Sequence, residues 1–481
     1  MMSLYDANSA QVIAAFILCW IPWAGYREWT RGSRDRIPLF VLLGFMYWIG
    51  YAVPLFWTKH EIHQADGGGH PLSESAITQS LYLVVLGVAA LGIGMTLGGR
   101  LRLLESIKLD IHQSPKKWHY LRFVLLAAVL LKIAVPISTL GGGGRQFLTI
   151  IETVVPSVAF AILLRYYLRG TAIPIDKCLL AGYAGISLIA GISSGWLGSF
   201  VGVAIIATGV YVYEKGKFPV VMIALAIPIV LFLQPGKERF RQQYWRSGAS
   251  ESYVERLSFW VESSWASWGE ALSNSDRKQA RDLANQTLGR LSLLQQTANV
   301  MESTPDRVPY QNGRLYSYMF VTIVPRLFWP DKPSVNGANR WYQVAYGLTT
   351  RDDLNGVSIA VGYLTESYIN FGWLGPPVIL FCLGILLGLF DKIFLRPHSG
   401  LLLNSIGMAL LPHVLPVEAQ LAQYLGGVGQ QVVVALITMA PMFDLHPNRG
   451  GRLFFPIGAS YKVAGPMSSV SRTQAEPLRR F

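Results

Sequence analysis

A dense group of cationic and aromatic side chains directly follows an uncharged apolar run, in the stretch QPGKERFRQQYWR at 234–246. Guanidinium groups fit phosphate oxygens geometrically, and aromatic faces suit sugar rings or the membrane interface. The alternative is that these side chains snorkel and only anchor the chain to acidic lipid headgroups. We favour a binding role, because the short loops expected on this side of the membrane avoid cations. The candidate binding residues are Lys237, Arg239, Arg241, Trp245 and Arg246.

A second basic and aromatic group lies in VPRLFWPDKPSVNGANRWYQVAYGLTTRDDLNG at 324–356, where three prolines fix turns. Cations alternate with aromatic rings there, which suits an anionic ligand that carries sugars. The alternative is a solvated loop whose tryptophans lie at the membrane interface. The candidate binding residues are Arg326, Arg340, Trp341, Tyr342 and Arg351.

Glu366 is the only carboxylate in 354–373, a stretch of 20 residues that is otherwise uncharged. Poor solvation raises the pKa of a carboxyl group, so such a side chain can exchange a proton near neutral pH. The alternative is a carboxylate satisfied by a neighbouring arginine. We therefore take Glu366 as a candidate catalytic residue.

These groups belong to a chain of 481 residues that is 52% hydrophobic and only 14% charged. A soluble domain carries about 25% charged residues. Uncharged apolar runs recur along the chain and are long enough to cross a hydrocarbon core of about 30 Å. The sequence therefore predicts an all-α, polytopic integral membrane protein. The eleven expected spans are 10–26, 37–56, 77–98, 119–139, 147–164, 178–194, 197–213, 219–234, 374–395, 400–415 and 428–445.

Lysine and arginine are distributed very unevenly among the connecting loops. The loops 27–36, 99–118, 165–177, 214–218 and 392–396, with the tail from 449, hold 22 of them, whereas the alternating loops 57–76, 140–146, 195–196 and 416–427 hold two. Cytoplasmic loops of membrane proteins carry the excess of positive charge. We therefore expect the N-terminus outside and the C-terminus in the cytoplasm. The net charge of +13 then reflects topology, and no nucleic-acid partner is expected.

The loop pattern divides the chain into four regions. They are an N-terminal bundle of about eight spans (1–234), a large external segment (235–373), the last three spans (374–445) and a basic cytoplasmic tail (446–481). An external segment of 139 residues is rare unless it is functional. Within it, FWVESSWASWGEAL is amphipathic and typical of a helix in the headgroup region. We interpret the apolar pieces 318–330 and 357–373 as membrane-dipping or surface helices over an external cavity.

Small residues recur in two of the expected spans. Gly92, Gly94 and Gly98 lie in 77–98, and Gly384 and Gly388 lie in 374–395. Such spacing predicts close helix–helix packing in a membrane.

The sequence gives little indication of a cofactor. It contains no phosphate loop and no dinucleotide fingerprint, so ATP-driven transport by this chain alone is not expected. Cys19, Cys178 and Cys382 lie in apolar runs and are interpreted as small hydrophobic residues. His60, His63 and His70 have a metal-like spacing, but nothing nearby supplies a fourth ligand. We expect neither a metal nor an organic cofactor.

Three stretches resemble the Wzy-type oligosaccharide repeat-unit polymerases of bacterial O-antigen and exopolysaccharide synthesis. They are VPRLFWPDKP, NGANRWYQVAYG and ESYINFGWLG, within 318–375, together with the basic helix end at 237–246. The plan of eleven spans with one large external loop before the last few is also similar. The resemblance implies a fold like that of the GT-C membrane glycosyltransferases, which use polyprenyl-linked donors. It also implies a bacterial inner-membrane location with the external segment in the periplasm.

The resemblance implies that a growing glycan leaves its polyprenyl diphosphate and joins a hydroxyl on the next lipid-linked repeat unit. The diphosphate is a good leaving group, so the enzyme needs cations to hold it rather than a metal. It also needs a base to deprotonate the acceptor hydroxyl. On this basis Glu366 is the base and Asp331 the second candidate, while the tryptophans and tyrosines stack on sugar. Arg239, Arg241 and Arg326 hold the diphosphate, with Arg340 and Arg351 as further candidates.

Two alternatives remain open at this point. An O-antigen ligase would use the same donor with a different acceptor. A lipid-linked sugar flippase or secondary transporter would need ionisable groups deep in several spans, where the sequence offers Lys132 and little else. The expected partners are a polyprenyl-diphosphate-linked oligosaccharide and the lipid bilayer, with a chain-length regulator and a flippase as candidate protein partners.

Overall fold

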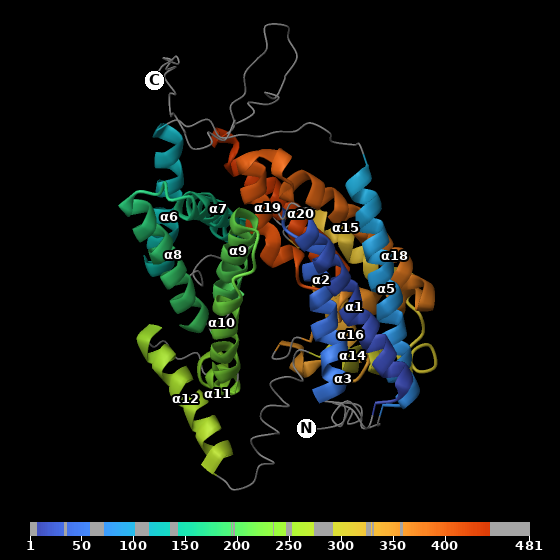
Figure 1. Cartoon of the computed structure of the whole chain (residues 1–481). Helices are drawn as coiled ribbons and strands as arrows, with labels where there is room; N and C mark the ends of the chain where they lie inside the picture. The colour runs from blue at the N-terminus through green and yellow to red at the C-terminus, as the bar shows by residue number, and fades with distance from the viewer. Residues whose placement is uncertain are drawn as a thin grey trace, which may run out of the picture.

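The computed structural model is built from helices and their connections, without a β-strand in the residues that it describes. Those residues are 7–32, 36–57, 72–101, 115–134, 143–193, 195, 198–233, 235–246, 253–273, 292–323, 329, 331–355 and 359–442. Two groups of helices stand side by side in Figure 1, with α6 and α8–α12 in one and α1, α2, α3, α5, α14, α15, α16 and α18 in the other. Helices α7, α19 and α20 pack between them.

The N-terminal part up to the large external segment contains a series of long helices. They are α1 (Ser9–Arg31), α2 (Leu39–Tyr47), the π-helical turn η1 (Trp48–Ala52), α3 (Val53–Trp57), α5 (Glu74–Arg100), α6 (Pro115–Ala134), α7 (Gly143–Leu168), α8 (Pro174–Ser193), α9 (Gly198–Lys215) and α10 (Val220–Leu233).

The remaining chain begins with shorter helices and ends with three apolar ones. They are α11 (Gly236–Arg241), η3 (Gln242–Arg246), α12 (Tyr253–Ser273), α14 (Leu294–Ser303), η4 (Arg314–Ser317), α15 (Tyr318–Ile323), α16 (Gly337–Ala345), η5 (Asp352–Asn355), α17 (Tyr363–Phe371), η6 (Gly372–Leu374), α18 (Gly375–Phe390), η7 (Asp391–Leu395), η8 (Pro397–Ser399), α19 (Gly400–Val414), α20 (Leu421–Thr438) and η9 (Ala440–Met442).

Six helical segments of the described chain are long and apolar enough to cross a membrane. They are Ser9–Arg31, Leu39–Phe56, Glu74–Arg100, Leu148–Leu168, Tyr363–Leu395 and Leu421–Thr438. The eleven expected segments coincide with helices over most of their described length, but α10 and α19 contain only 14 and 15 residues. Helices of that length reach about 21–23 Å, which is less than a hydrocarbon core of about 30 Å. The fold is thus that of a helical membrane protein, with six such segments rather than eleven.

A seam of glycines joins α5 to α18, as the sequence predicted. A Cβ added to Gly94 would lie 2.2 Å from the carbonyl oxygen of Phe381, and one added to Gly384 would lie 2.4 Å from that of Leu91. Only glycine permits this approach of two backbones. Gly92 lies outside the seam, since its added Cβ would meet the ring of Phe40 on α2. The seam consists of Gly94, Gly98, Gly384 and Gly388.

The start of α1, the start of α5 and helix α14 lie at one end of the molecule (Figure 1). Gln11 Nε2 donates to Glu74 Oε2 over 2.7 Å, and the hydroxyl of Ser73 donates to Glu302 at the end of α14. Segments that were expected to face outside therefore share one end.

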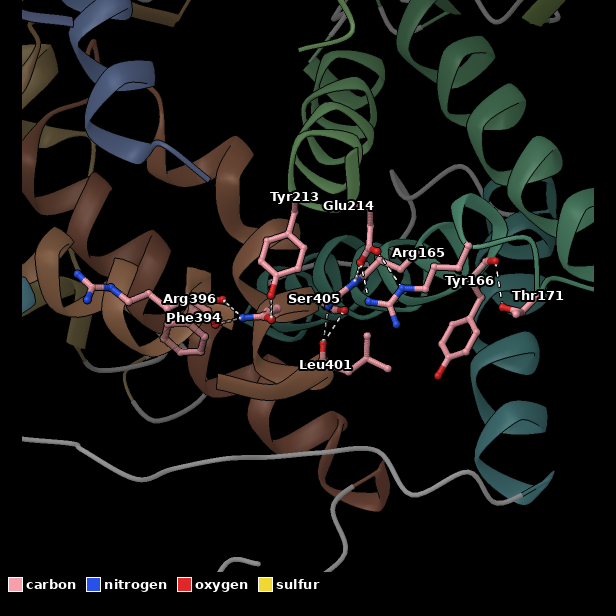
Figure 2. A network of polar contacts seen from close by, with 11 residues as sticks. Arg165, Tyr166, Thr171, Tyr213, Glu214, Phe394, Arg396, Leu401 and Ser405 are labelled. Carbon is pink, nitrogen blue, oxygen red and sulfur yellow. Dashed lines mark hydrogen bonds and ion pairs between the residues drawn. The ribbon is translucent and has the colours of Figure 1, made fainter. Parts of the chain in front are cut away.

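The opposite end contains a buried ionic network (Figure 2). Arg165 near the end of α7 is 3% exposed, and its Nε lies 2.6 Å from Glu214 Oε1 on α9. Arg169 Nε lies 2.8 Å from the other oxygen of the same carboxylate. The hydroxyl of Tyr213 donates to Asn404 Oδ1 on α19 over 2.6 Å. The network ties α7 and α9 to α19.

The external segment contains the helices that the sequence indicated, but one piece is placed differently. α12 and α14 are amphipathic helices, and α15 covers the beginning of the apolar piece 318–330. The piece 357–373 was expected to be a membrane-dipping or surface helix. Instead, its helix α17 is buried from Tyr363 to Asn370 against α14, α18 and α20, and it begins the apolar segment Tyr363–Leu395, which is long enough to cross a membrane.

Candidate functional site

Glu366 lies in the middle of α17 and is completely buried. Its Oε2 atom accepts a hydrogen bond of 2.6 Å from the backbone N–H of Leu421, the first residue of α20. Its Oε1 atom has no hydrogen-bond partner among the described residues. The side chain therefore fixes the start of α20 with one oxygen and leaves the other available for chemistry.

Buried tyrosines surround the start of α17. The ring of Tyr363 lies 6.4 Å from that of Tyr47 and 5.3 Å from that of Tyr424, and Tyr47 stacks on Tyr51 at 5.9 Å. Tyr424 donates its hydroxyl to the carbonyl of Val414. The hydroxyls of Tyr47 and Tyr363 approach each other without hydrogen-bond geometry. Three distant parts of the sequence thus supply one group of buried hydroxyls.

Tyr47 and Tyr51 are brought there by a local irregularity of the second apolar segment. The π-helical turn η1 separates α2 from α3, and such turns occur frequently at functional sites. The carbonyl of Gly50 within the turn accepts a 2.8 Å hydrogen bond from the N–H of Leu293, just before α14. Thr297 on α14 and Thr365 on α17 share a hydrogen bond of 2.7 Å. The external segment is therefore anchored to η1 and α17.

The segment after α14 is anchored to the other end of α17. Gln311 and Asn312 donate their backbone N–H groups to the carbonyls of Ile369 and Asn370, over 2.9 and 3.0 Å. Asn312 and Gly313 adopt left-handed conformations, with φ of 47° and 85°, which makes the tight turn that these bonds require. The polar side of α17 thus lies beneath the external segment.

Helix α20 contacts α15, which precedes the motif at 324–356, and its N-cap residue Gln420 contacts the motif itself. Gln430 Nε2 donates to the carbonyl of Thr322 over 2.8 Å, and Gln420 Nε2 donates to the carbonyl of Val335. The ammonium of Lys332 is buried and donates to the carbonyl of Val321. The same helix therefore contacts Glu366 and the basic motif.

The candidate residues of this motif differ in exposure. Asp331, Arg340 and Arg351 are exposed, and Trp341 is half-buried with its ring 6.3 Å from that of Tyr346. Tyr342 is fully buried, so a sugar could stack on its ring only after the covering residues move. Burial raises the pKa of the Tyr342 hydroxyl and raises that of Tyr346 to about 12, so both stay protonated at neutral pH. Arg326 lies outside the described residues.

The candidate residues of the first basic group lie on α11 and η3. The Nη2 atom of Arg239 is 3.1 Å from Glu270 Oε2 on α12, and both side chains are exposed. Lys237 and Arg241 are half-buried. The side chains of Trp245 and Arg246 are outside what the structure describes.

The structure does not place the two basic groups in one core. Phe240 and Tyr244 pack with Leu233 and Trp260 in a small cluster of their own. Tyr342 and the tyrosines around Glu366 belong to the main core. Helix α11 packs against α12, and no hydrogen bond or ion pair of the described residues joins Arg239 to Glu366.

Sequence reasoning missed the tyrosines of the site and the role of Leu421. Tyr47 and Tyr51 stand four residues apart in an otherwise apolar segment, and this spacing is a signal that they share a helix face. Tyr363, three residues before Glu366, is a second such signal. Nothing local indicates Leu421, since it contributes only its backbone N–H. His60, His63 and His70 lie outside the described residues.

Apolar helices long enough to cross a membrane and a glycine seam between two of them define a helical integral membrane protein. The chain belongs to the DUF8712 family, a domain of unknown function, which matches residues 45–393. The match includes Tyr47, Tyr51 and Glu366 as well as both basic groups. No curated protein and no solved structure matches the chain.

Proposed function

We propose that this chain is a membrane glycosyltransferase that joins polyprenyl-diphosphate-linked oligosaccharide repeat units on the periplasmic side of a bacterial inner membrane. The observation that carries the proposal is the buried carboxylate of Glu366, with one oxygen fixed by Leu421 and the other without a partner in the described chain. The external segment anchored above α17 supports a substrate site on that side. Under this proposal the architecture is GT-C-like, and the N-terminus is periplasmic.

Glu366 is the proposed base for the acceptor hydroxyl. A carboxylate oxygen without a partner can accept the proton of a hydroxyl group, which is the step that general base catalysis requires. The buried hydroxyls of Tyr47, Tyr51 and Tyr363 offer both donors and acceptors, which suits a ligand rich in hydroxyl groups. Because Glu366 is completely buried, the substrate has to displace part of the external segment to reach it. Exposed Asp331 remains the second candidate base.

The separation of the two basic groups refines the assignment of the cations. The attacking hydroxyl and the leaving diphosphate meet at one sugar carbon, so the cations that hold the leaving group have to lie near the base. The motif at 324–356 is joined through Gln420 to the start of α20, where Leu421 binds Glu366, and this supports Arg340, Arg351 and Arg326 for the donor. The acceptor repeat unit stays linked to its own polyprenyl diphosphate, which lies at the end of the unit away from the attacking hydroxyl. We assign this second diphosphate to Lys237, Arg239 and Arg241 on α11.

The proposal is tested by the polysaccharide of a deletion strain that expresses variants of the chain. Glu366→Gln keeps an oxygen that can accept the Leu421 N–H but cannot take up a proton. We expect normal protein levels, single repeat units still attached to their acceptor, and no long-chain ladder. Asp331→Asn tests the second candidate base, and we expect it to keep the ladder. A full ladder with Glu366→Gln would remove Glu366 as the base.

The same experiment separates the alternatives. Loss of every attached sugar in the deletion strain would indicate a ligase, which uses the same donor with another acceptor. Loss of lipid-linked repeat units from the periplasmic face would indicate a flippase or transporter. An unchanged polysaccharide in the deletion strain would refute the proposed function as a whole.

A further inference from the structure

Helix α12 carries an apolar stripe that no described part of the protein covers. Val254 is 74% exposed, Val261 39% and Trp265 72%. Positions seven and four residues apart lie within about 40° of each other around a helix, so these side chains form one face. The opposite face contains Trp260, which is completely buried. Helix α12 is therefore packed against the protein by one face, while the stripe remains exposed on another.

Two indole groups fix α12 across the end of α10. Trp260 Nε1 donates to the carbonyl of Leu233 over 2.7 Å, and Trp268 Nε1 donates to that of Phe232 over 3.1 Å. The last carbonyls of a helix lack partners within it, and these two are satisfied by α12. The position of α12 along the membrane normal is therefore set by the residue at which α10 ends.

The length of α10 places this point inside the apolar layer. Its 14 residues reach about 21 Å, which leaves about 9 Å of a 30 Å hydrocarbon core uncrossed. The side chains of Val221 and Ile229 on α10 are largely exposed, as expected for contact with lipid. The ring of Trp265 lies 6.2 Å from that of Phe232, so the stripe of α12 continues the apolar surface of α10.

Charged side chains of the hairpin lie beside the stripe rather than on it. Glu255 and Glu262 are exposed and each follows a stripe residue, which places them about 100° away around the helix. Glu270 pairs with Arg239 of α11. An amphipathic helix at a membrane surface has this division between an apolar face and a charged flank.

From these observations we propose that the α11–α12 hairpin docks on the lipid bilayer. The stripe of Val254, Val261 and Trp265 lies in the acyl region, and Glu255 and Glu262 lie among the headgroups. The occupant of the stripe is lipid, because α10 is too short to cross alone and its lipid-facing surface continues into α12. Lys237, Arg239 and Arg241 are thereby held at the level of the lipid phosphates. This inference stands without the proposed enzymatic function.

Spin labels at neighbouring positions test the proposal. Single cysteines replace Val254, Glu255, Val261 or Glu262 in the full chain, after Cys19, Cys178 and Cys382 are changed to serine. The protein is placed in nanodiscs of phosphatidylethanolamine and phosphatidylglycerol. Labels at Val254 and Val261 should collide mainly with oxygen, which concentrates in lipid. Labels at Glu255 and Glu262 should collide mainly with a water-soluble nickel chelate.

Equal access of the nickel chelate to all four labels would overturn the proposal, since the stripe would then face water. Labels at Val254 and Val261 that neither reagent reaches would also overturn it, because a protein partner or a second copy would then cover the stripe. Brominated lipid gives a second measurement that does not depend on cysteine variants. It should quench the fluorescence of the native protein more than that of Trp265→Phe, and equal quenching would count against lipid contact.

Discussion

The carboxylate of Glu366 holds the first backbone N–H of α20 through a hydrogen bond of 2.6 Å to Leu421. An acidic side chain at this position is favourable, because the N-terminus of a helix carries partial positive charge. The bond spans 55 residues of sequence and joins α17 to the helix that contacts the basic motif. A proton taken up by Glu366 would weaken this contact, so the chemistry proposed for the residue is coupled to the position of α20.

Substitutions at Glu366 separate its structural role from its chemical one. Glu366→Ala removes the acceptor for a buried N–H, and a lost partner of this kind costs about 1–3 kcal/mol. Glu366→Gln retains an acceptor, so we expect a smaller loss of stability. Thermal denaturation of the detergent-purified protein measures the difference. Equal loss in both variants would show that the negative charge itself is needed to hold α20.

The glycine seam predicts a sharp positional difference in tolerance to alanine. In Gly94→Ala the new methyl group meets the Phe381 carbonyl at 2.2 Å, and overpacking of this kind costs about 1–3 kcal/mol. Gly427→Ala on α20 adds a methyl group in open space and should be neutral or stabilising by about 0.5–1 kcal/mol, because alanine favours helix. Unfolding midpoints of the two variants measure the contrast. Similar midpoints would mean that α5 and α18 can separate at little cost.

Composition and spacing were sufficient for the helical membrane class, for the seam and for Glu366 as an isolated carboxylate. These features are local, since an apolar run, two glycines four apart or a single charge is visible in a short window. The number of membrane spans was less predictable. An apolar stretch such as 219–234 does not reveal that its helix stops after 14 residues, where the indoles of α12 bind its last carbonyls.

The residues that contact α17 could not be predicted, because they come from distant parts of the chain. Tyr47 reaches the site through a π-helical turn, and a sequence pattern of period 3.6 does not encode that turn. Leu421 takes part through its backbone, so its side-chain type carries no information. The separation of Arg239 from the site also depends on tertiary contacts, since Trp260 draws α11 and α12 into their own cluster.

The ionic network around Glu214 predicts a dependence of stability on pH. Burial alone would raise the pKa of Glu214, but hydrogen bonds and charges of Arg169 and Arg165 outweigh it and hold the pKa below the usual value. A carboxyl group whose pKa is lower in the folded state stabilises the fold at pH values above its ordinary pKa. This contribution is lost as the pH falls through the folded-state value.

Glu214→Gln measures this contribution directly. At neutral pH the variant leaves Arg165 buried without its charged partner, and breaking a buried pair costs about 3–5 kcal/mol. In acid the native carboxyl group is neutral as well, so the difference in unfolding midpoint should shrink as the pH falls below the ordinary glutamate pKa. A difference that stays constant across this range would contradict the assignment.

The two ends of the molecule should react differently with a thiol reagent that cannot cross membranes. Thr350 and Thr171 are both exposed threonines, one following the motif at 324–356 and the other in a loop expected to be cytoplasmic. In a cysteine-free background, Thr350→Cys should be labelled on intact spheroplasts, and Thr171→Cys only after the membrane is opened. The physical reason is the charge bias, since loops rich in lysine and arginine stay in the cytoplasm. The reverse labelling pattern would invert the topology and place Glu366 beneath the cytoplasmic face. The proposed lipid-linked repeat units would then be joined before their export rather than after it.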